Sequence, residues 1–425
     1  MHLSADYWID NLDHPDEVLM APEKIAALNG DSLANDPNLV ELASYPEQVS
    51  HEVVERAIRS ISKPYHADLF YRDGGKVSAA DYEGYTGNLN LDGLQDEVSV
   101  RYALVLERAD MRTWPTRDVV FKSRETRDLD RFQENGLFPA EVVVVLHESE
   151  DGLWCFVQSY NYGAWVLKNK VVTGPREEVI RYRDKPDFMV VTGSKVTTNL
   201  NPRVPAVSEL QLDMGVRLPL AELANRSNNG SDRLSETSYA VQVPVRGKNG
   251  KLEFETATIA RSQDVHLGYL PYTRKNIILQ AFKFLGEPYG WGHSFNARDC
   301  TGLVSEVYKT MGIYLPRNSR QQCHSPIGDN TSFSPEATAE EKLSAVAKAD
   351  VGDLLYSTDH VMVYLGTEDT GPFVIHDVSG SGWVDAEGEH HKGTVNGVSV
   401  TPLLPTRAEQ QHIYFEQMYA IKQIR

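Results

Sequence analysis

The hydrophobic pattern of this 425-residue chain changes twice along its length, and these two changes most constrain the fold. Apolar residues recur at helical spacing in residues 49–61 and again in residues 277–285, towards the two ends. Between them lie short apolar runs, such as residues 102–106 and 142–146, separated by turn sequences such as Glu150-Asp151-Gly152. Helical periodicity predicts helices, and short runs bounded by turn residues predict strands. We therefore expect a helical N-terminal part, a middle part built of strands, and a C-terminal part that combines helix and sheet.

The strand-rich part runs through two cycles, which predicts two small β-barrels rather than one large sheet. The second cycle extends from residues 188–191 to residues 257–259 and contains an insertion rich in Asn and Ser at 225–235. At roughly 150 residues per domain, a chain of this length holds several domains. We predict a multidomain α+β protein with a mostly helical segment at 1–98 that packs on the rest, barrels at 99–175 and 176–272, and an α+β domain at 273–425.

Within the N-terminal segment two local features carry more detailed expectations. Asp36-Pro37 is predicted to start a helix, and the glycine-containing stretch at residues 84–93 is predicted to be a loop. Near the other end, residues 331–350 are expected to form a surface insertion or a short helix.

Charge and hydropathy exclude several classes of protein. The 42 Lys and Arg residues against 60 Asp and Glu residues give a net charge of −18, which repels a nucleic-acid backbone. Apolar runs such as residues 142–146 are far shorter than the ~20 residues that cross a bilayer. We expect no nucleic-acid partner and no transmembrane segment. The first residues lack the features of a secretory leader, which favours the cytoplasm unless a leader has been removed.

The three cysteines, Cys155, Cys300 and Cys323, can form neither a disulfide framework nor a Cys-x-x-Cys metal site. Cys155 and Cys323 are expected to be small buried residues. Cys300 differs because it follows Asp299, a good helix N-cap, and opens an apolar pattern of helical period that ends near Gly312. A thiol in the first turn of a helix meets the positive end of the helix dipole, which predicts a lowered pKa and a nucleophile.

A nucleophilic cysteine needs a base, and two downstream histidines are candidates. His360 begins one predicted strand and His376 lies in the next. If Leu365 pairs with Phe373, both histidines fall on one face of the sheet as diagonal neighbours, ~7–8 Å apart, and their imidazoles can bond. His390-His391, among acidic residues, is expected to be a solvated turn rather than a metal site. No metal and no cofactor are predicted.

The residues around these candidates form a series of spaced motifs. They are Leu285-Gly286-x-Pro288-Tyr289-x-Trp291-Gly292, Asp299-Cys300-x-Gly302-Leu303-Val304, Gly312-Ile313-x-Leu315-Pro316-Arg317-x-Ser319-x-x-Gln322, Gly352-Asp353-Leu354, His360-Val361-x-Val363-Tyr364-Leu365-Gly366 and Ile375-His376. In these motifs the last third of the chain resembles the NlpC family of papain-like bacterial cell-wall peptidases. The resemblance implies a helix that carries the nucleophile packed on an antiparallel sheet that carries the base.

By this resemblance Cys300 is the nucleophile, His360 the general base and His376 the residue that orients the base. Tyr289 would lie near the oxyanion, together with the backbone N–H of Cys300. Upstream, Arg112-Thr113-Trp114-Pro115-Thr116 and Gly163-Ala164-Trp165-Val166 look like the bacterial SH3-like barrels that precede this catalytic domain in one branch of the family.

Members of that branch cut the γ-D-glutamyl–diamino-acid bond of peptidoglycan stem peptides, L-Ala-γ-D-Glu-diamino acid, and the first barrel narrows the cleft so that a free N-terminal L-alanine is required. The resemblance assigns the alanine amine to Asp299 and a substrate contact to Thr301, which stands where Ser is usual. Tyr162 and Trp165 are candidates for the side chain that narrows the cleft. His293 replaces a usual glycine.

Two alternatives to a peptidase of this kind stay open. One is a peptidoglycan-binding scaffold with an inactive peptidase domain, and the other is an amidase or acyltransferase that uses the same cysteine and histidines. A monomer is expected. A cell-wall substrate would place the protein in the bacterial envelope or periplasm, and the cytoplasm is the alternative location.

Overall fold

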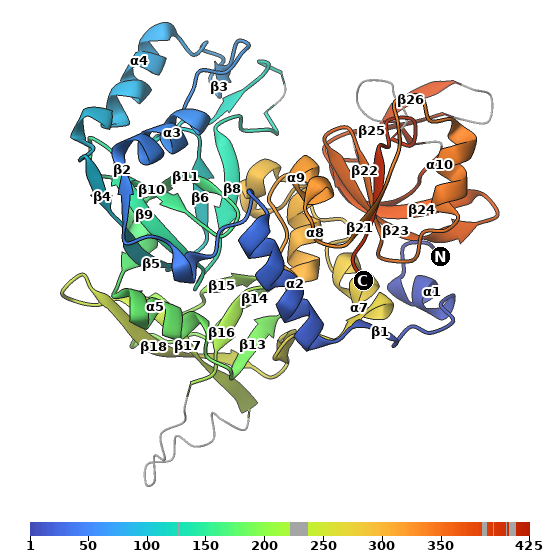
Figure 1. Cartoon of the computed structure of the whole chain (residues 1–425), viewed down its shortest axis with the longest axis horizontal. Helices are drawn as coiled ribbons and strands as arrows, with labels where there is room; N and C mark the ends of the chain where they lie inside the picture. The colour runs from blue at the N-terminus through green and yellow to red at the C-terminus, as the bar shows by residue number, and fades with distance from the viewer. Residues whose placement is uncertain (126, 222–236, 385–388, 394, 405, 408–413) are drawn as a thin grey trace. The chain divides into compact units, whose positions relative to one another are not determined.

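The structure, a computed structural model, describes residues 1–125, 127–221, 237–384, 389–393, 395–404, 406–407 and 414–425. The predicted Asn- and Ser-rich insertion lies outside these described residues. The chain divides into two compact units (Figure 1). Unit 1 holds residues 1–39, 270–290 and 295–425, and unit 2 holds residues 40–269 and 291–294. None of the described helices is long and apolar enough to cross a membrane.

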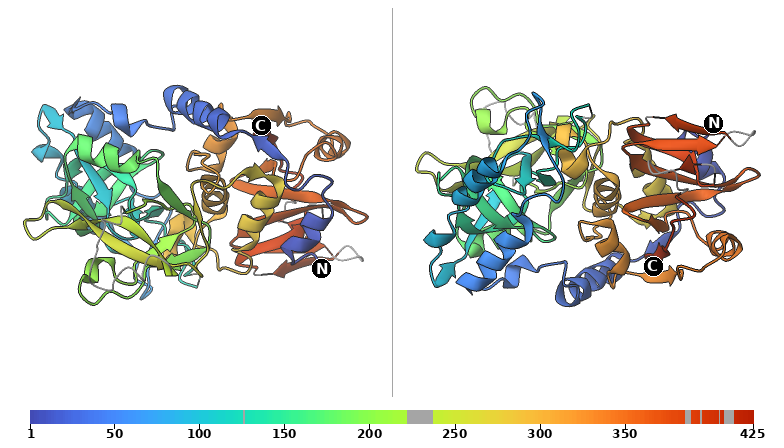
Figure 2. Two further views of the ribbon diagram at one scale, coloured as in Figure 1. Left: turned by 90° about the horizontal axis from the view of Figure 1, so that it is seen from below. Right: turned by 90° about the horizontal axis from the view of Figure 1, so that it is seen from above.

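Among its described residues, unit 1 is built on an antiparallel sheet of six strands, coloured orange to red in the two views of Figure 2. In spatial order they are β21 (Asp329–Ser332), β29 (Ala420–Gln423), β22 (Leu354–Ser357), β23 (His360–Glu368), β24 (Gly371–Val378) and β27 (Gly397–Pro402). Alternating residues such as Met362, Tyr364 and Val374 form a hydrophobic core on one face of this sheet. A smaller sheet contains β25 (Ser381–Val384), β26 (His390–Gly393) and β28 (Thr406–Arg407).

The helix α8 (Cys300–Lys309) packs against β23 and β24, and α7 (Arg274–Phe282) packs against α8. All ten residues of α8 are buried. The helix stops at Gly312, whose φ of +80° suits glycine, and the Ile313 N–H closes the end by donating to the Tyr308 carbonyl at 3.1 Å. Two further helices of unit 1, α9 (Ser319–His324) and α10 (Ala339–Val346), follow.

The first 39 residues belong to unit 1 although 230 residues of unit 2 follow them. Their elements are α1 (Ala5–Asp10), β1 (Val18–Met20) and α2 (Pro22–Asn35). The strand β1 pairs with β20 (Tyr272–Thr273), and the Asn29 side-chain amide donates to the Gly312 carbonyl at 2.7 Å. These contacts attach the N-terminal residues to the part of unit 1 that surrounds α8.

Unit 2 contains, in its described residues, a sheet of seven antiparallel strands. In spatial order they are β12 (Val171–Thr173), β5 (Arg101–Val105), β9 (Val142–Glu148), β10 (Trp154–Gln158), β11 (Gly163–Leu167), β6 (Ala109–Arg112) and β8 (Gln133–Leu137). Both faces are buried: Cys155 and Val157 of β10 belong to one hydrophobic cluster, and Trp154 and Phe156 belong to another. Burial on both faces explains why these strands are runs of Val rather than alternating patterns.

Unit 2 has further elements outside this sheet. Its described residues include the α-helices α3 (His51–Ile61), α4 (Ala79–Asn88) and α5 (Arg176–Arg183). Its smaller sheets pair β2 (Gln48–Ser50) with β4 (Glu97–Ser99), β3 (Phe70–Tyr71) with β7 (Val120–Phe121), β14 (Lys195–Thr197) with β15 (Gln211–Asp213), β17 (Ser238–Arg246) with β18 (Leu252–Ala260), and β13 (Phe188–Val191) with both β16 (Arg217–Pro219) and β19 (Val265–Leu267).

Several local predictions need correction. Asp36-Pro37 follows the end of α2 instead of starting a helix. Part of the predicted loop at 84–93 is helical, because Ser78 and Asp81 form a reciprocal capping box that starts α4. His390-His391 lies on β26 rather than in a turn. The predicted short helix within residues 331–350 is confirmed as α10, and β21, which begins just before this stretch, joins the sheet of unit 1.

A close backbone approach at Gly328 yields a first prediction. A Cβ atom there would lie 2.1 Å from the Gln423 carbonyl oxygen, and φ is +70°, whereas Gly286 has a φ of +82° and open space around it. We expect Gly328→Ala to lower the free energy of unfolding by about 3 kcal/mol and Gly286→Ala by about 1 kcal/mol. Hydrogen exchange of β29 peptides in increasing urea measures both, and equal losses would contradict the steric explanation.

Candidate active site

The site is organised by the first turn of α8. The Asp299 carboxylate caps the helix by accepting the Gly302 N–H at 2.9 Å, as predicted, so Cys300 is the first helical residue. The Cys300 residue is 7% exposed. Its sulfur accepts a hydrogen bond from the Val361 backbone N–H. Because Val361 follows His360 directly, the thiol lies beside the start of the strand that carries the candidate base.

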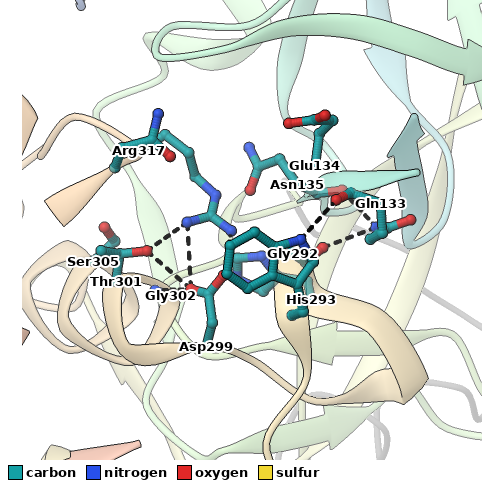
Figure 3. A network of polar contacts seen from close by, with 12 residues as sticks. Gln133, Glu134, Asn135, Gly292, His293, Asp299, Thr301, Gly302, Ser305 and Arg317 are labelled. Atoms are coloured by element: carbon teal, nitrogen blue, oxygen red, sulfur yellow. Dashed lines mark hydrogen bonds and ion pairs between the residues drawn. The ribbon is translucent and has the colours of Figure 1, made fainter. Parts of the chain in front are cut away.

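Arg317 holds the capping carboxylate in place (Figure 3). Its Nη2 donates to Asp299 Oδ2 at 2.6 Å, and its Nη1 donates to the Thr301 hydroxyl oxygen. The Thr301 hydroxyl donates in turn to Asp299 Oδ1 at 2.9 Å. All three side chains are buried. Asp299 and Thr301, the predicted substrate-binding pair, are therefore engaged with each other and with Arg317 in this structure.

The thiol environment differs from the prediction. Burial, followed by the neighbouring Asp299 carboxylate, raises the pKa of Cys300 to about 12, while the Val361 N–H acts in the opposite direction. The expectation of a lowered pKa is therefore wrong for this structure. The helix start was visible in the sequence, but the burial of its first turn was not.

The two histidines meet as predicted. His360 Nε2 lies 2.9 Å from His376 Nδ1, and the Val363–Ile375 and Tyr364–Val374 pairs confirm the register on the histidine side of the hairpin. The assumed Leu365–Phe373 pair is wrong, because Gly366 faces Phe373 and a bulge takes up Leu365. The bulge shifts the register by one residue between the loop and the histidines. Beyond the bulge the register is the predicted one, which places both imidazoles on the same face of the sheet.

Burial also sets the charge of this pair. It lowers the pKa of His360 to about 3, although the Asp299 carboxylate acts against this, and it holds the pKa of His376 well below its usual value. Both rings are thus neutral at neutral pH. Since His360 Nε2 faces His376, its Nδ1 is the nitrogen that remains for the thiol.

Sequence reasoning missed two neighbours of the histidines. Thr401 on β27 places Oγ1 3.0 Å from His376 Nε2. The Tyr414 ring lies 4.7 Å from the His360 ring and 5.6 Å from the His376 ring, between centroids. The pairing of β24 with β27 was the missing signal, because the sequence between these strands gives no clue to their register.

Tyr289, which is predicted to lie near the oxyanion, lies close to the thiol. The Gly290 N–H donates to the Arg298 carbonyl at 2.7 Å, and the Tyr289 N–H donates to the Asn396 carbonyl at 3.2 Å. Burial, followed by Cys300, holds the pKa of Tyr289 well above its usual value, so its hydroxyl is a donor at neutral pH. Tyr289, Asp299, Cys300, His360 and His376 are thus brought to one place.

Trp165 and Tyr162, the candidates for the side chain that narrows the cleft, and His293 all lie in unit 2, each with different neighbours. Trp165 is fully buried in the hydrophobic core and donates Nε1–H to Ser62, which excludes it as a side chain that narrows a cleft. Tyr162 is half-buried, and its hydroxyl donates to Glu134 at 2.6 Å. His293, with a φ of +66°, packs its ring against Phe138. Gln133 holds the neighbouring backbone by donating to the Gly292 carbonyl at 2.8 Å (Figure 3).

Two segments of the chain match known domain families, and one of these segments contains the site. Residues 286–393, which contain the thiol and both histidines, match the model of the NlpC/P60 family. This part of the chain is an NlpC/P60 domain. Residues 120–167 match the SH3 domain of the SH3b1 type, within the first predicted barrel. The predicted resemblance and the mixed helix-and-sheet multidomain class are confirmed.

Two similar proteins extend the comparison beyond the NlpC/P60 domain. The chain is 29% identical over 219 residues to the gamma-D-glutamyl-L-lysine dipeptidyl-peptidase of Bacillus cereus, over 48% of this chain and 54% of that protein. The chain thus spans about half the length of this curated relative. A solved NlpC/P60 endopeptidase from Photobacterium damselae subsp. piscicida is similar in fold, with a TM-score of 0.78, 16% identity and coverage of 99% of this chain and 96% of that one.

The charge state of the thiol in the NlpC/P60 domain is directly testable. With a pKa of about 12, Cys300 alkylation by iodoacetamide should accelerate about tenfold per pH unit from pH 6 to 9, because the reactive thiolate grows in that proportion. Mass spectrometry of the Cys300 peptide measures the rate, and Cys155, 1% exposed, serves as a buried control in the same samples. A rate that levels off below pH 7 would instead indicate a preformed thiolate.

Asp377, beside the site, gives a prediction for stability. This side chain is fully buried, neither carboxyl oxygen has a hydrogen-bond partner among the described residues, and burial followed by Asp299 holds its pKa well above the usual value. The folded chain therefore keeps a proton that the unfolded chain releases above pH ~4. The wild type should lose stability relative to Asp377→Asn as pH rises from 4 to 6, by about 2 kcal/mol. Urea unfolding at both pH values tests this, and a constant difference would show an ionised Asp377.

Proposed function

We propose that this chain is a cysteine endopeptidase that hydrolyses the γ-D-glutamyl–diamino-acid bond of peptidoglycan stem peptides. The observation that carries the proposal is the position of the Cys300 thiol beside the start of β23, where His360 and His376 bond at 2.9 Å. A nucleophile, a base and a group that orients the base are the components of covalent acyl transfer. The match to the NlpC/P60 family supports this assignment.

The charge state of the site determines how the reaction begins. Because the thiol and both imidazoles are neutral at neutral pH, the Cys300 proton moves to His360 Nδ1 while the sulfur attacks the γ-glutamyl carbonyl carbon. The C=O electrons form an oxyanion, for which the Cys300 N–H and the Tyr289 hydroxyl are the proposed donors. The C–N bond then breaks, and His360 returns the proton to the leaving amine of the diamino acid.

Hydrolysis of the resulting thioester completes the cycle. Water gives a proton to His360 and attacks the acyl carbon, and the collapse of the second oxyanion breaks the C–S bond, which releases the glutamyl carboxylic acid and the Cys300 thiolate. The proton then returns from His360 to the Cys300 sulfur. The aromatic cover of Tyr414 on both imidazoles supports this role, because it restricts their rotation between the two steps.

The finer structural assignments belong to the same proposal. We propose a papain-like arrangement for residues 273–425, in which α8 carries the nucleophile and the sheet of unit 1 carries the base. The proposed preceding parts are a helical segment at 1–98 and SH3-like barrels at 99–175 and 176–272. The SH3b1 match at 120–167 supports the first barrel.

We further propose that the substrate carries a free N-terminal L-alanine and that the diamino acid is lysine or diaminopimelate. The name of the curated relative, a gamma-D-glutamyl-L-lysine dipeptidyl-peptidase, supports the bond that is cut. A monomer in the bacterial envelope, acting on stem peptides during cell-wall turnover or recycling, fits this substrate.

Product analysis tests the proposal. The chain should release L-alanyl-γ-D-glutamate from L-Ala-γ-D-Glu-L-Lys or its diaminopimelate analogue, as followed by liquid chromatography and mass spectrometry. N-acetylation of the alanine should abolish release. Cys300→Ala and His360→Ala should each lower kcat by about a thousandfold or more, while Cys323→Ala, which removes another buried thiol, should retain activity. Activity in Cys300→Ala would overturn the nucleophile, and cleavage before the alanine would indicate an amidase.

A further inference from the structure

The two histidines belong to a longer hydrogen-bonded chain that crosses three adjacent strands. The Oγ1 atom of Thr401 on β27 lies 3.0 Å from Nε2 of His376 on β24. The other ring nitrogen of His376, Nδ1, lies 2.9 Å from Nε2 of His360 on β23. The β24–β27 pairing fixes Thr401 opposite Val374, one step diagonally from His376. Each ring nitrogen of His376 therefore has a defined partner.

The number of protons allows two arrangements of the hydrogen bonds among Thr401, His376 and His360. A neutral imidazole has one N–H and one bare nitrogen, and both rings are neutral here. In the first arrangement His376 Nε2–H donates to Thr401, His360 Nε2–H donates to His376 Nδ1, and His360 Nδ1 is bare. In the second the Thr401 hydroxyl donates to His376, every bond reverses, and His360 Nδ1 carries the proton. Only a bare Nδ1 can accept the proton of the thiol.

We propose that Thr401 is a positioning residue that accepts the His376 Nε2–H and thereby sets the tautomers of both histidines. This inference rests on the proposed function, because it assigns His360 Nδ1 to the Cys300 proton. A hydroxyl oxygen suits the task, since it accepts through a lone pair while its own proton rotates away. Among the described residues the Thr401 hydroxyl bonds to His376 and not to the thiol, so its effect passes through His376.

Both rings are buried, and Tyr414 packs against both imidazoles. Among the described residues, Thr401 Oγ1 is the hydrogen-bond partner of His376 Nε2. Without an acceptor there, an Nε2–H is a buried unpaired donor, which disfavours that tautomer by about 1–3 kcal/mol. The ring then carries its proton on Nδ1 and donates to His360, and His360 loses its bare Nδ1.

The test compares Thr401→Val with Thr401→Ser. Valine nearly keeps the shape and suits a strand, but it offers no acceptor, whereas serine keeps the hydroxyl. In the valine variant we expect kcat on the stem tripeptide to fall about 10- to 100-fold with little change in KM, and the serine variant should stay within about threefold of wild type. Nitrogen-15 shifts of the histidine rings, assigned with His360→Gln and His376→Gln, should show His376 protonated on Nε2 in wild type and on Nδ1 in Thr401→Val.

The ring shifts are measured without substrate, so they separate this inference from the proposed function. If no stem peptide is cut but the shifts change as expected, the proposed function fails and the role of Thr401 stands. Wild-type ring shifts and wild-type kcat in Thr401→Val would overturn the inference. A serine variant as impaired as the valine variant would also overturn it, because it would show a packing role instead of a hydrogen bond.

Discussion

A buried carboxylate, that of Asp299, determines where the candidate nucleophile lies. It accepts the Gly302 N–H and so starts α8 at Cys300, and Arg317 holds it by a buried ion pair. An ion pair of this kind adds little net stability compared with apolar packing, because both charges lose their hydration. Its contribution is geometric: the carboxylate cannot leave the cap without exposing the Arg317 charge in the interior. The first turn of α8, and with it the thiol, is thereby fixed against β23.

The same burial keeps the thiol and both imidazoles neutral. Cys300 holds its proton, while His360 and His376 lack a second one, so an ion pair is not the resting state. Such a site keeps its nucleophile unreactive until a carbonyl is present and proton transfer can accompany attack. The direction of proton transfer then depends on the tautomers of the rings. That dependence gives a remote hydroxyl, Thr401, influence over a thiol that it does not touch.

Local patterns predicted the elements well, and distant pairings account for the errors. The Asp299 cap, the helix from Cys300 and the turn at Gly312 depend on neighbours within one or two turns, so the sequence carries them. The histidine register was predicted correctly from an incorrect starting pair, because the bulge at Leu365 compensated for the wrong choice of loop. The alternation of polar and apolar residues along one strand does not reveal a bulge, and only the pairing with the neighbouring strand shows it.

The sequence by itself determined which residues are chemically able to act: a cysteine at a helix start, two histidines on adjacent strands, and a tyrosine before the helix. These follow from local spacing and residue type. Only the tertiary structure decided their protonation and their partners, because both depend on what surrounds each group in space. Burial of α8 raised the pKa of Cys300 where the helix dipole alone predicted a lower one. The position of β27 beside β24 brought Thr401 to His376, and no local pattern encodes that neighbour.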